Sequence, residues 1–282
     1  MQKMPTGVDN FRILREKNYY FVDKTYFIKE ILDNQVPVTL ITRPRRFGKT
    51  LLLSMLKEFF DIHAAWEDGY YDEMISFMRQ FYSEVLKSNE TLEFAVLTGV
   101  LRVAKESIFS GLNNLRVCSV LSAAYRDVFG FTGAEVAKMA KDLGKEDKLP
   151  EIREWYDGYS FGGQEIYNPW SVIQYFQEGC TPAPYWVNTS ANGIIRQMVQ
   201  GLSRKTESEL QQLMQGESVC KTVHENVVYN EIGQNSDDFY TMLLITGYLK
   251  AANTDVNLFG ETVVLRIPNK EIFNLFRIEI GL

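Results

Sequence analysis

The hydrophobic positions in the first part of the chain repeat with the periods of buried strands and of amphipathic helices. The run VPVTLIT, residues 36–42, is almost entirely apolar and rich in β-branched side chains, which is typical of a strand buried on both faces of a parallel sheet. The runs LEFAVLTG (92–99) and LRVCSVL (115–121) predict two further strands. Apolar residues recur with helical spacing in three segments: 25–32, 49–62 and 70–87. Strands that alternate with helices predict an α/β fold.

The pattern changes after about Tyr125, where shorter helices, polar breaks and aromatic residues follow. In TGAEVAKMAKDLG, Thr132 is a candidate N-cap and Gly144 a candidate helix end. Residues 236–276 then show the pattern of a helix, a strand hairpin and a last helix, which is compatible with a winged-helix-like module. We interpret one aromatic group as packing residues rather than as a ligand site: Trp155, Tyr156, Tyr159, Phe161, Tyr167 and Trp170. The predicted organisation has three parts: a core at 1–125, a helical lid-like region at 126–215 and the winged-helix-like module at 216–282.

Composition and charge narrow the function classes. The net charge of −6 argues against an extended nucleic-acid surface, and 45% hydrophobic with 23% charged residues excludes a disordered chain. Cys118, Cys180 and Cys220 have no CxxC spacing, and His63 and His224 stand alone, so neither a disulfide framework nor a zinc site is expected. No run approaches 18 apolar residues and the first residues hold no apolar leader segment, so we expect a cytoplasmic protein without a membrane partner.

The segment RPRRFGKT, residues 43–50, is the strongest candidate for chemistry and is named the phosphate loop below. It ends in the GK[ST] half of the GxxxxGK[ST] motif and lies between a predicted buried strand and a predicted helix. Gly48 would let the backbone approach a phosphate, Lys49 would reach the β and γ oxygens, and the Thr50 hydroxyl would bind Mg²⁺. The alternative is a structural turn that contains Gly-Lys-Thr by chance.

Several neighbouring residues join this candidate nucleotide site. The amides from Gly48 to Leu51 open a helix, whose N-terminus favours an anion. Three arginines and one lysine within eight residues favour a polyanionic ligand over plain solvated charges. The nucleotide-binding residues that we predict are Arg43, Pro44, Arg45, Arg46, Phe47, Gly48, Lys49, Thr50 and Leu51.

Long stretches of the chain resemble the AAA-ATPase-like proteins that are abundant in gut anaerobes, so a bacterial protein is expected. The resemblance rests on NYYFVDKTYFIKEIL, LITRPRRFGKTLLLSMLKEFF, WYDGYSFGGQEIYNPWSV and YWVNTSAN, among other segments, and covers nearly the whole chain. It implies a P-loop NTPase core with an AAA-like parallel sheet, with ATP and Mg²⁺ as ligands. Arg43 in place of the first glycine of the motif is itself typical of that family.

Two departures from the family pattern bear on activity. Family members carry an apolar strand followed by Asp-Glu, the Walker B element, after the phosphate-loop helix, and a nuclease-like domain of the PD-(D/E)XK type near the end. Here the chain is shortened near residues 62–68, and it ends at Leu282. The nearest acids, which follow no predicted buried strand, are Asp61, Glu67, Asp68 and Asp72. We therefore expect ATP binding with weak or absent hydrolysis.

Further expectations follow from the resemblance. Thr98 and Arg102 are candidates for sensors of the γ-phosphate, although Thr98 can equally be an ordinary strand-end residue. The strand at 36–42 is expected in the middle of the sheet, between 94–98 on one side and 117–120 on the other. Loss of the Walker B strand would leave 94–98 as an apolar edge that could pair with another protein or with a second copy.

A second function class remains open at this point. The chain could be a non-enzymatic interaction module, associated with DNA through the winged-helix-like segment. Its candidate DNA contacts are basic residues of that segment: Lys250, Arg266, Lys270 and Arg277.

Overall fold

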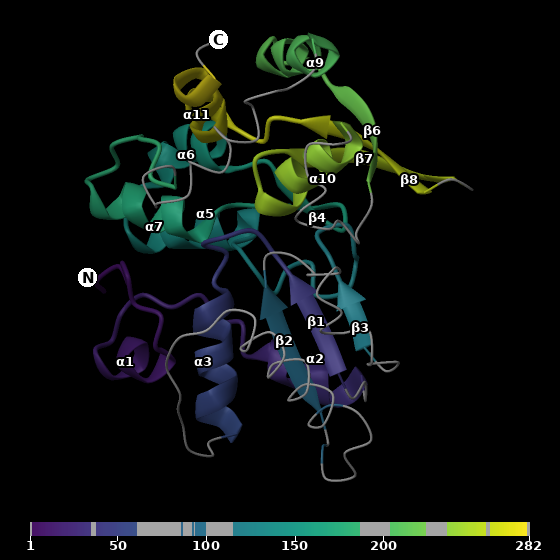
Figure 1. Ribbon diagram of the computed structural model, residues 1–282. Helices are drawn as coiled ribbons and strands as arrows, with labels where there is room; N and C mark the ends of the chain where they lie inside the picture. Colours follow the sequence, from purple (N-terminus) through teal and green to yellow (C-terminus); the bar gives the residue numbers. More distant parts are fainter. Residues whose placement is uncertain are drawn as a thin grey trace, which may run out of the picture.

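The protein is represented by a computed structural model, which has a parallel sheet below and an antiparallel sheet with helices above (Figure 1). The structure describes these residues: 2–34, 38–60, 86, 92, 94–99, 115–186, 204–223, 236–257 and 260–280. The predicted helix at 70–87 lies outside the described residues except for Leu86. None of the helices within these ranges is long and apolar enough to cross a membrane.

The lower layer is a three-stranded parallel sheet. Strand β1 (Val38–Thr42) lies between β2 (Ala95–Gly99) and β3 (Leu115–Cys118), and both pairings are parallel. The predicted order is therefore confirmed. Strand β3 ends at Cys118 rather than at Val120, because Ser119 begins a turn in which its carbonyl accepts the Ser122 amide.

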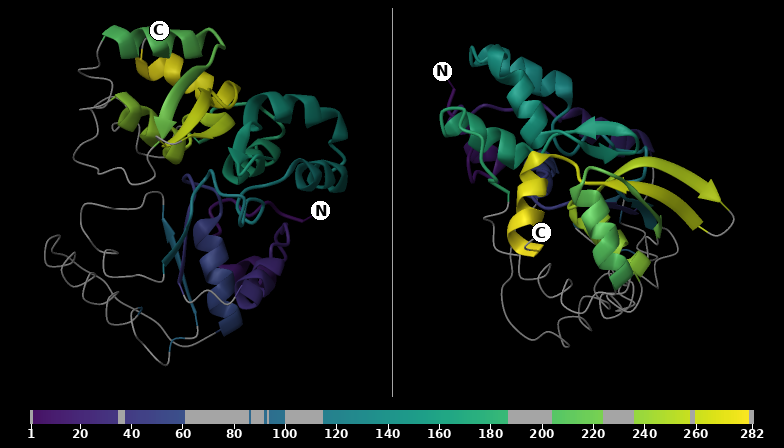
Figure 2. Two further views of the ribbon diagram at one scale, coloured as in Figure 1. Left: turned by 90° about the vertical axis from the view of Figure 1, so that its right-hand side faces the viewer. Right: turned by 90° about the horizontal axis from the view of Figure 1, so that it is seen from above.

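Helices α2 (Tyr26–Asn34) and α3 (Lys49–Phe60) cover one face of this sheet (Figure 2). Every residue of β1 is buried, as the continuous apolar run predicted. The helices contribute apolar side chains to a shared core with Ile41: Phe27, Ile28, Ile31, Leu52, Met55 and Leu56. The short helix α1 (Phe11–Glu16) joins the same side, where the Phe11 amide donates to Ser54 Oγ at 2.9 Å.

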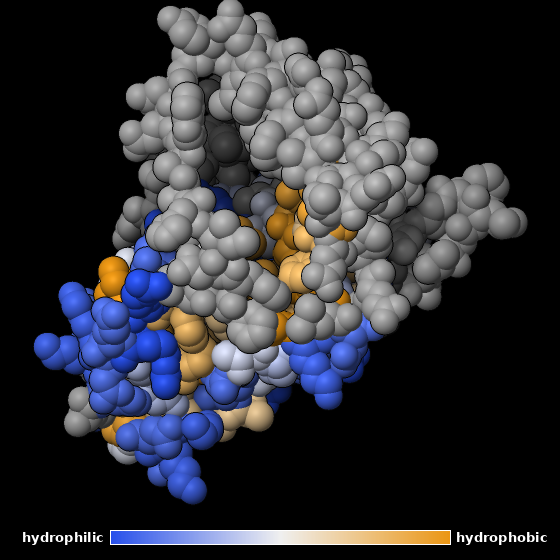
Figure 3. Space-filling model, turned by 90° about the horizontal axis from the view of Figure 1, so that it is seen from below, coloured by the Kyte–Doolittle hydropathy of each residue, from blue (hydrophilic) through white to orange (hydrophobic). Residues whose placement is uncertain are grey.

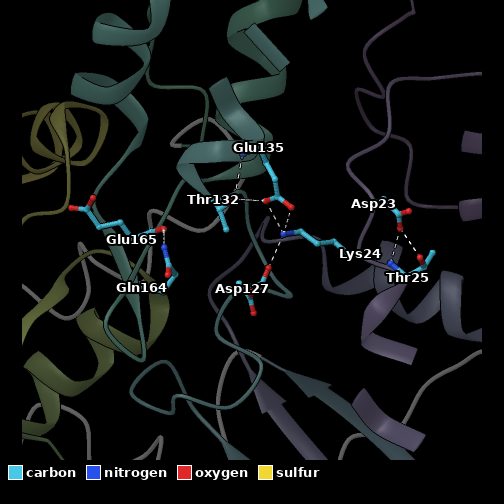
Figure 4. A network of polar contacts seen from close by, with 8 residues as sticks. All are labelled: Asp23, Lys24, Thr25, Asp127, Thr132, Glu135, Gln164 and Glu165. Atoms are coloured by element: carbon cyan, nitrogen blue, oxygen red, sulfur yellow. Dashed lines mark hydrogen bonds and ion pairs between the residues drawn. The ribbon is translucent and has the colours of Figure 1, made fainter. Parts of the chain in front are cut away.

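Lys24 ties the start of the chain to the middle region (Figure 4). Its ammonium lies 2.7 Å from the Glu135 carboxylate and donates to the Asp127 carbonyl at 2.6 Å. Glu135 also accepts from the Thr132 amide, while Thr132 accepts from the Glu135 amide. This capping box confirms Thr132 as the N-cap of α5 (Gly133–Asp142), and Gly144 follows the helix with a φ of +64°.

The rest of the middle region is short helices and one hairpin. Their bounds are η1 (Glu146–Lys148), α6 (Leu149–Tyr156), β4 (Tyr159–Phe161), β5 (Gln164–Ile166), α7 (Pro169–Gln177) and α9 (Arg204–Met214). Tyr156, Tyr159 and Phe161 are almost fully buried within two apolar cores, as expected of packing residues. The two-residue turn of this hairpin uses Gly162 and Gly163, both with positive φ.

The last part contains a three-stranded antiparallel sheet in the order β6-β8-β7. Its elements are β6 (Val219–Val223), α10 (Ser236–Thr246), β7 (Lys250–Asn257), β8 (Gly260–Arg266) and α11 (Lys270–Ile280). The predicted helix, hairpin and last helix are confirmed. Helix α10 is buried at every position from Phe239 to Ile245, so it forms the centre of this part.

Strand β2 has a sheet partner on one side only within the described residues. Its residues are half-buried, and Leu86 packs with Val38 and near Ala95 and Leu97. Seen from below, this face shows hydrophobic residues beside hydrophilic ones (Figure 3). Residues 61–85, where a further strand would come from, also lie outside, so the exposed apolar edge stays a prediction.

Candidate nucleotide site at the phosphate loop

The phosphate loop leads from the carboxyl end of β1 into α3. At its start, the Arg43 amide donates to the carbonyl of Gly99, which closes β2. At its end, the Gly48 carbonyl accepts from the Leu52 amide at 2.9 Å, so the helix continues directly from the loop. Gly48 has a φ of +81° and open space where a side chain would be, so it provides the turn that lets the following amides begin the helix.

Lys49 folds back into the loop. Its Nζ donates to the carbonyl of Arg43 at 3.0 Å and to that of Pro44 at 2.6 Å. Burial, with the nearby guanidinium groups of Arg45 and Arg43, lowers the pKa of Lys49 to about 8. An anion placed beside Nζ would therefore relieve an unfavourable electrostatic environment.

The residues that follow Lys49 lie at the first turn of α3. Thr50 is exposed and Leu51 is half-buried. Their amides belong to the first turn, whose N–H groups have no partner inside an α-helix and favour an anion. Gly48, Lys49, Thr50 and Leu51 therefore lie together at the start of α3.

The side chain of Arg43 points into the protein instead. It is fully buried, and its Nη1 donates to the carbonyls of Thr42, Cys118 and Ser119 at 2.7, 3.1 and 2.7 Å. Nη2 donates to the Tyr125 carbonyl at 3.0 Å. The guanidinium joins β1 to the segment after β3, so the expectation that it meets a polyanion does not fit its position.

Phe47 and Pro44 also face inward. Phe47 is 1% exposed and contacts the rings of Tyr159 and Phe161, with centroids 4.9 and 5.1 Å away. Pro44 is buried against Gly247, at the end of α10, where an added Cβ would lie 2.8 Å from the proline Cβ. These two side chains fix the loop to the upper layer.

Arg45 and Arg46 each lie over a tryptophan. The Arg46 guanidinium carbon is 4.6 Å from the centre of the Trp170 ring, and that of Arg45 is 5.5 Å from the Trp186 ring. Trp186 also donates its indole N–H to the Arg45 carbonyl at 3.3 Å. Both contacts were missed in the sequence, where Trp170 was assigned to packing and Trp186 had no role.

Comparison with known proteins gives a family-model match to the N-terminal part of the chain. The family model described as predicted AAA-ATPase (AAA-ATPase-like) matches residues 5–67 and 62–109. The N-terminal part of the chain, residues 5–109, is therefore similar to the AAA-ATPase-like family. The phosphate loop, with Arg43 at its first position, lies inside the first matched segment.

A relative from Azotobacter chroococcum mcd 1, described as "Uncharacterized protein in vnfD 5'region", is similar over a longer stretch. The alignment has 25% identity over 366 residues and covers 96% of this chain and 68% of the relative. Because the chain itself has 282 residues, the alignment contains at least 84 positions that this chain lacks. No solved structure matches the chain.

The remaining candidate residues are placed only in part. Thr98 lies in β2 opposite Ile41, one residue before the Gly99 carbonyl that contacts the loop. Arg102 lies outside the described residues, as do the acids Asp61, Glu67, Asp68 and Asp72. Among the described residues no group of three His, Cys, Asp or Glu side chains could hold a metal ion.

Proposed function

We propose that this protein binds ATP with Mg²⁺ at the phosphate loop and hydrolyses it weakly or not at all. One observation supports the proposal most directly: the Lys49 ammonium lies inside the loop, next to the start of α3, and its hydrogen-bond partners among the described residues are main-chain carbonyls. A phosphate group could replace these neutral acceptors with a charged one, which is the stronger interaction. Binding would use Gly48, Lys49, Thr50 and the amide of Leu51.

The expectation of slow hydrolysis rests on the acidic pair. The chain contains one Asp-Glu pair, Asp72-Glu73, and Gly69, Tyr70 and Tyr71 precede it in place of an apolar strand. The two family-model segments overlap at 62–67, which supports an internal shortening near that point. The alignment with the relative contains at least 84 positions that this chain lacks. Without an acid at the end of a neighbouring strand, Mg²⁺ and the attacking water would lack their usual protein partners.

Titration with a fluorescent ATP analogue in the presence of Mg²⁺ tests binding. Lys49→Ala should weaken binding about tenfold or more, because a charge-assisted hydrogen bond contributes about 1.5–3 kcal/mol. Lys138→Ala removes the same charge from an exposed side chain and should leave the affinity unchanged. Affinity should also fall above about pH 8, where Lys49 loses its proton. Equal affinity of the wild type and Lys49→Ala would refute the proposal.

Measurement of steady-state phosphate release tests the proposed weak or absent hydrolysis. Turnover should stay far below the roughly 1 s⁻¹ at which ordinary enzymes begin. Turnover at or above that rate, abolished by Lys49→Ala, would mean that an acid outside the described residues serves the site.

The order of α9, β6, α10 and the β7–β8 hairpin supports the winged-helix-like assignment, yet it does not favour DNA binding. Because Phe239 to Ile245 of α10 are all buried, this helix cannot enter a DNA groove as a recognition helix does. Among the candidate basic residues, Lys270 forms an ion pair with Glu154 at 2.9 Å and lies over the Trp155 ring.

A further inference from the structure

We infer that Glu271 is a positioning residue for the phosphate loop, because it anchors the two tryptophans that hold Arg45 and Arg46. This inference rests on the proposed nucleotide binding and deepens it, since it assigns control of the same site to the last helix. The segment that carries both tryptophans, residues 169–186, is named the tryptophan arm below.

One end of the tryptophan arm contacts Arg46. Helix α7 begins after Asn168, whose side chain accepts from the Trp170 and Ser171 amides. This cap fixes Trp170 at the first turn, where its ring faces the Arg46 guanidinium at 4.6 Å. Its indole N–H donates to the Tyr185 carbonyl at 3.3 Å, so the two ends of the arm are joined to each other.

The other end of the arm contacts Arg45. The Trp186 side chain is fully buried, with its ring over the Arg45 guanidinium and its N–H on the Arg45 carbonyl. Tyr248 packs edge-on against the same indole, with ring centres 4.8 Å apart. A hydrogen bond to the main chain of Arg45 constrains the loop backbone itself, which a cation–π contact with a flexible side chain does not do.

Glu271 holds both ends of the arm from the first turn of α11. Its carboxylate accepts from the Trp186 amide at 2.8 Å and from the Ser171 hydroxyl at 2.8 Å. Ser171 follows Trp170 directly, so one carboxylate contacts the backbone of Trp186 and the side chain next to Trp170. Glu271 is fully buried, and burial raises its pKa to about 8. A carboxyl group in such a place carries a desolvation cost, which its hydrogen bonds offset only in part.

The geometry therefore forms a connected path from α11 through the tryptophan arm to the phosphate loop. A second contact of the same upper layer runs in parallel, where Gly247 packs against Pro44. Loss of the Glu271 anchor should free Trp186 to move away from the Arg45 carbonyl and leave the loop less ordered. A less ordered loop binds phosphate more weakly, because ligand binding must then order it.

Calorimetric titration with Mg²⁺ and the non-hydrolysable ATP analogue AMP-PNP tests the inference, at a temperature well below the melting point of each variant. Glu271→Met and Trp186→Phe should each weaken binding about fivefold or more, the loss that corresponds to one hydrogen bond of about 1 kcal/mol. Glu271→Gln keeps an acceptor for the Trp186 amide and should restore wild-type affinity within about twofold. Trp155→Phe is the matched control, because that ring lies under Lys270 instead of the loop.

A double variant separates positioning from general stability. If Glu271 acts through Trp186, the variant with both Glu271→Met and Trp186→Phe should bind no more weakly than the weaker single variant. Unchanged affinity in Glu271→Met and Trp186→Phe, beside a clear loss in Lys49→Ala, would overturn this inference and leave the proposed function intact. If the wild-type protein does not bind the analogue, both this inference and the proposed function are refuted. If Glu271→Met does not fold, Trp186→Phe alone decides between these outcomes.

Discussion

Replacing Arg43 should damage folding far more than ligand binding. The position corresponds to the first glycine of the phosphate-loop motif, yet the guanidinium donates to four buried backbone carbonyls: those of Thr42, Cys118, Ser119 and Tyr125. It also lies over the Phe129 and Phe161 rings, at 5.6 and 5.0 Å. A side chain in this position cannot reach a ligand without first leaving the core.

The expected magnitude follows from these contacts. Four charge-assisted hydrogen bonds at about 1.5–3 kcal/mol each give a gross contribution of roughly 6–12 kcal/mol. Burial of the charge offsets several kcal/mol of this, and burial lowers the Arg43 pKa to about 10, in agreement with that cost. Arg43→Met should therefore lower the free energy of unfolding by about 3–5 kcal/mol. Arg43→Lys should lose about half as much, since an ammonium cannot present donors in the same planar fork.

Urea unfolding followed by circular dichroism measures these differences. Arg153→Lys is the matched control, because that arginine is exposed and should change stability by less than about 0.5 kcal/mol. Stability of Arg43→Lys within about 1 kcal/mol of the wild type would refute the reasoning. If that variant also lost affinity for the ATP analogue, Arg43 would be a phosphate ligand, as its place in the motif first indicated.

Two further predictions concern the contacts above the phosphate loop. The folded-state pKa of Glu271, about 8, lies above its ordinary value of 4.5, so the folded protein binds more protons between these values. Stability should thus fall as pH rises from about 4.5 to 8, by up to about 1.4 kcal/mol per pH unit from this group. Thermal unfolding of Glu271→Gln should show a melting temperature that depends less on pH than that of the wild type. The same pH dependence in both proteins would contradict the burial argument. Gly247→Ala should lower the melting temperature more than Gly216→Ala does. Both glycines have a positive φ, but an added Cβ clashes with Pro44 only at Gly247, and equal effects would mean that the contact yields easily.

The sheet could be predicted from the sequence because its central strand is buried on both faces. Residues 38–42 form one mainly apolar run rich in β-branched side chains, and the neighbouring parallel strands at 95–99 and 115–118 are also short, mainly apolar runs. Their order did not follow from the pattern itself but from resemblance to related ATPases. A helix end could also be predicted where its capping residue lies next to the helix in the sequence, as Thr132 shows.

The direction of the Arg43 side chain could not be predicted in the same way. Its partners at Cys118, Ser119 and Tyr125 are 75 to 82 positions away in the sequence, and the acceptors are backbone carbonyls, which no residue type reveals. Glu271 was missed for a related reason. It lies in the same helix as the exposed Lys270 and Arg277, and its partners come from the tryptophan arm, 85 and 100 positions earlier.

The altered phosphate loop can keep its shape because its turns do not depend on the first position. Arg43 has no positive φ, whereas Arg46 and Gly48 adopt φ values of +66° and +81°. Glycine at position 43 would therefore add flexibility without relieving strain, and arginine there gains a buried anchor. The strain falls on Arg46, where a left-handed conformation costs about 1–2 kcal/mol for a residue with a Cβ. The contact of its guanidinium with Trp170 offsets part of this cost, so the tryptophan arm and the loop sequence support one conformation together.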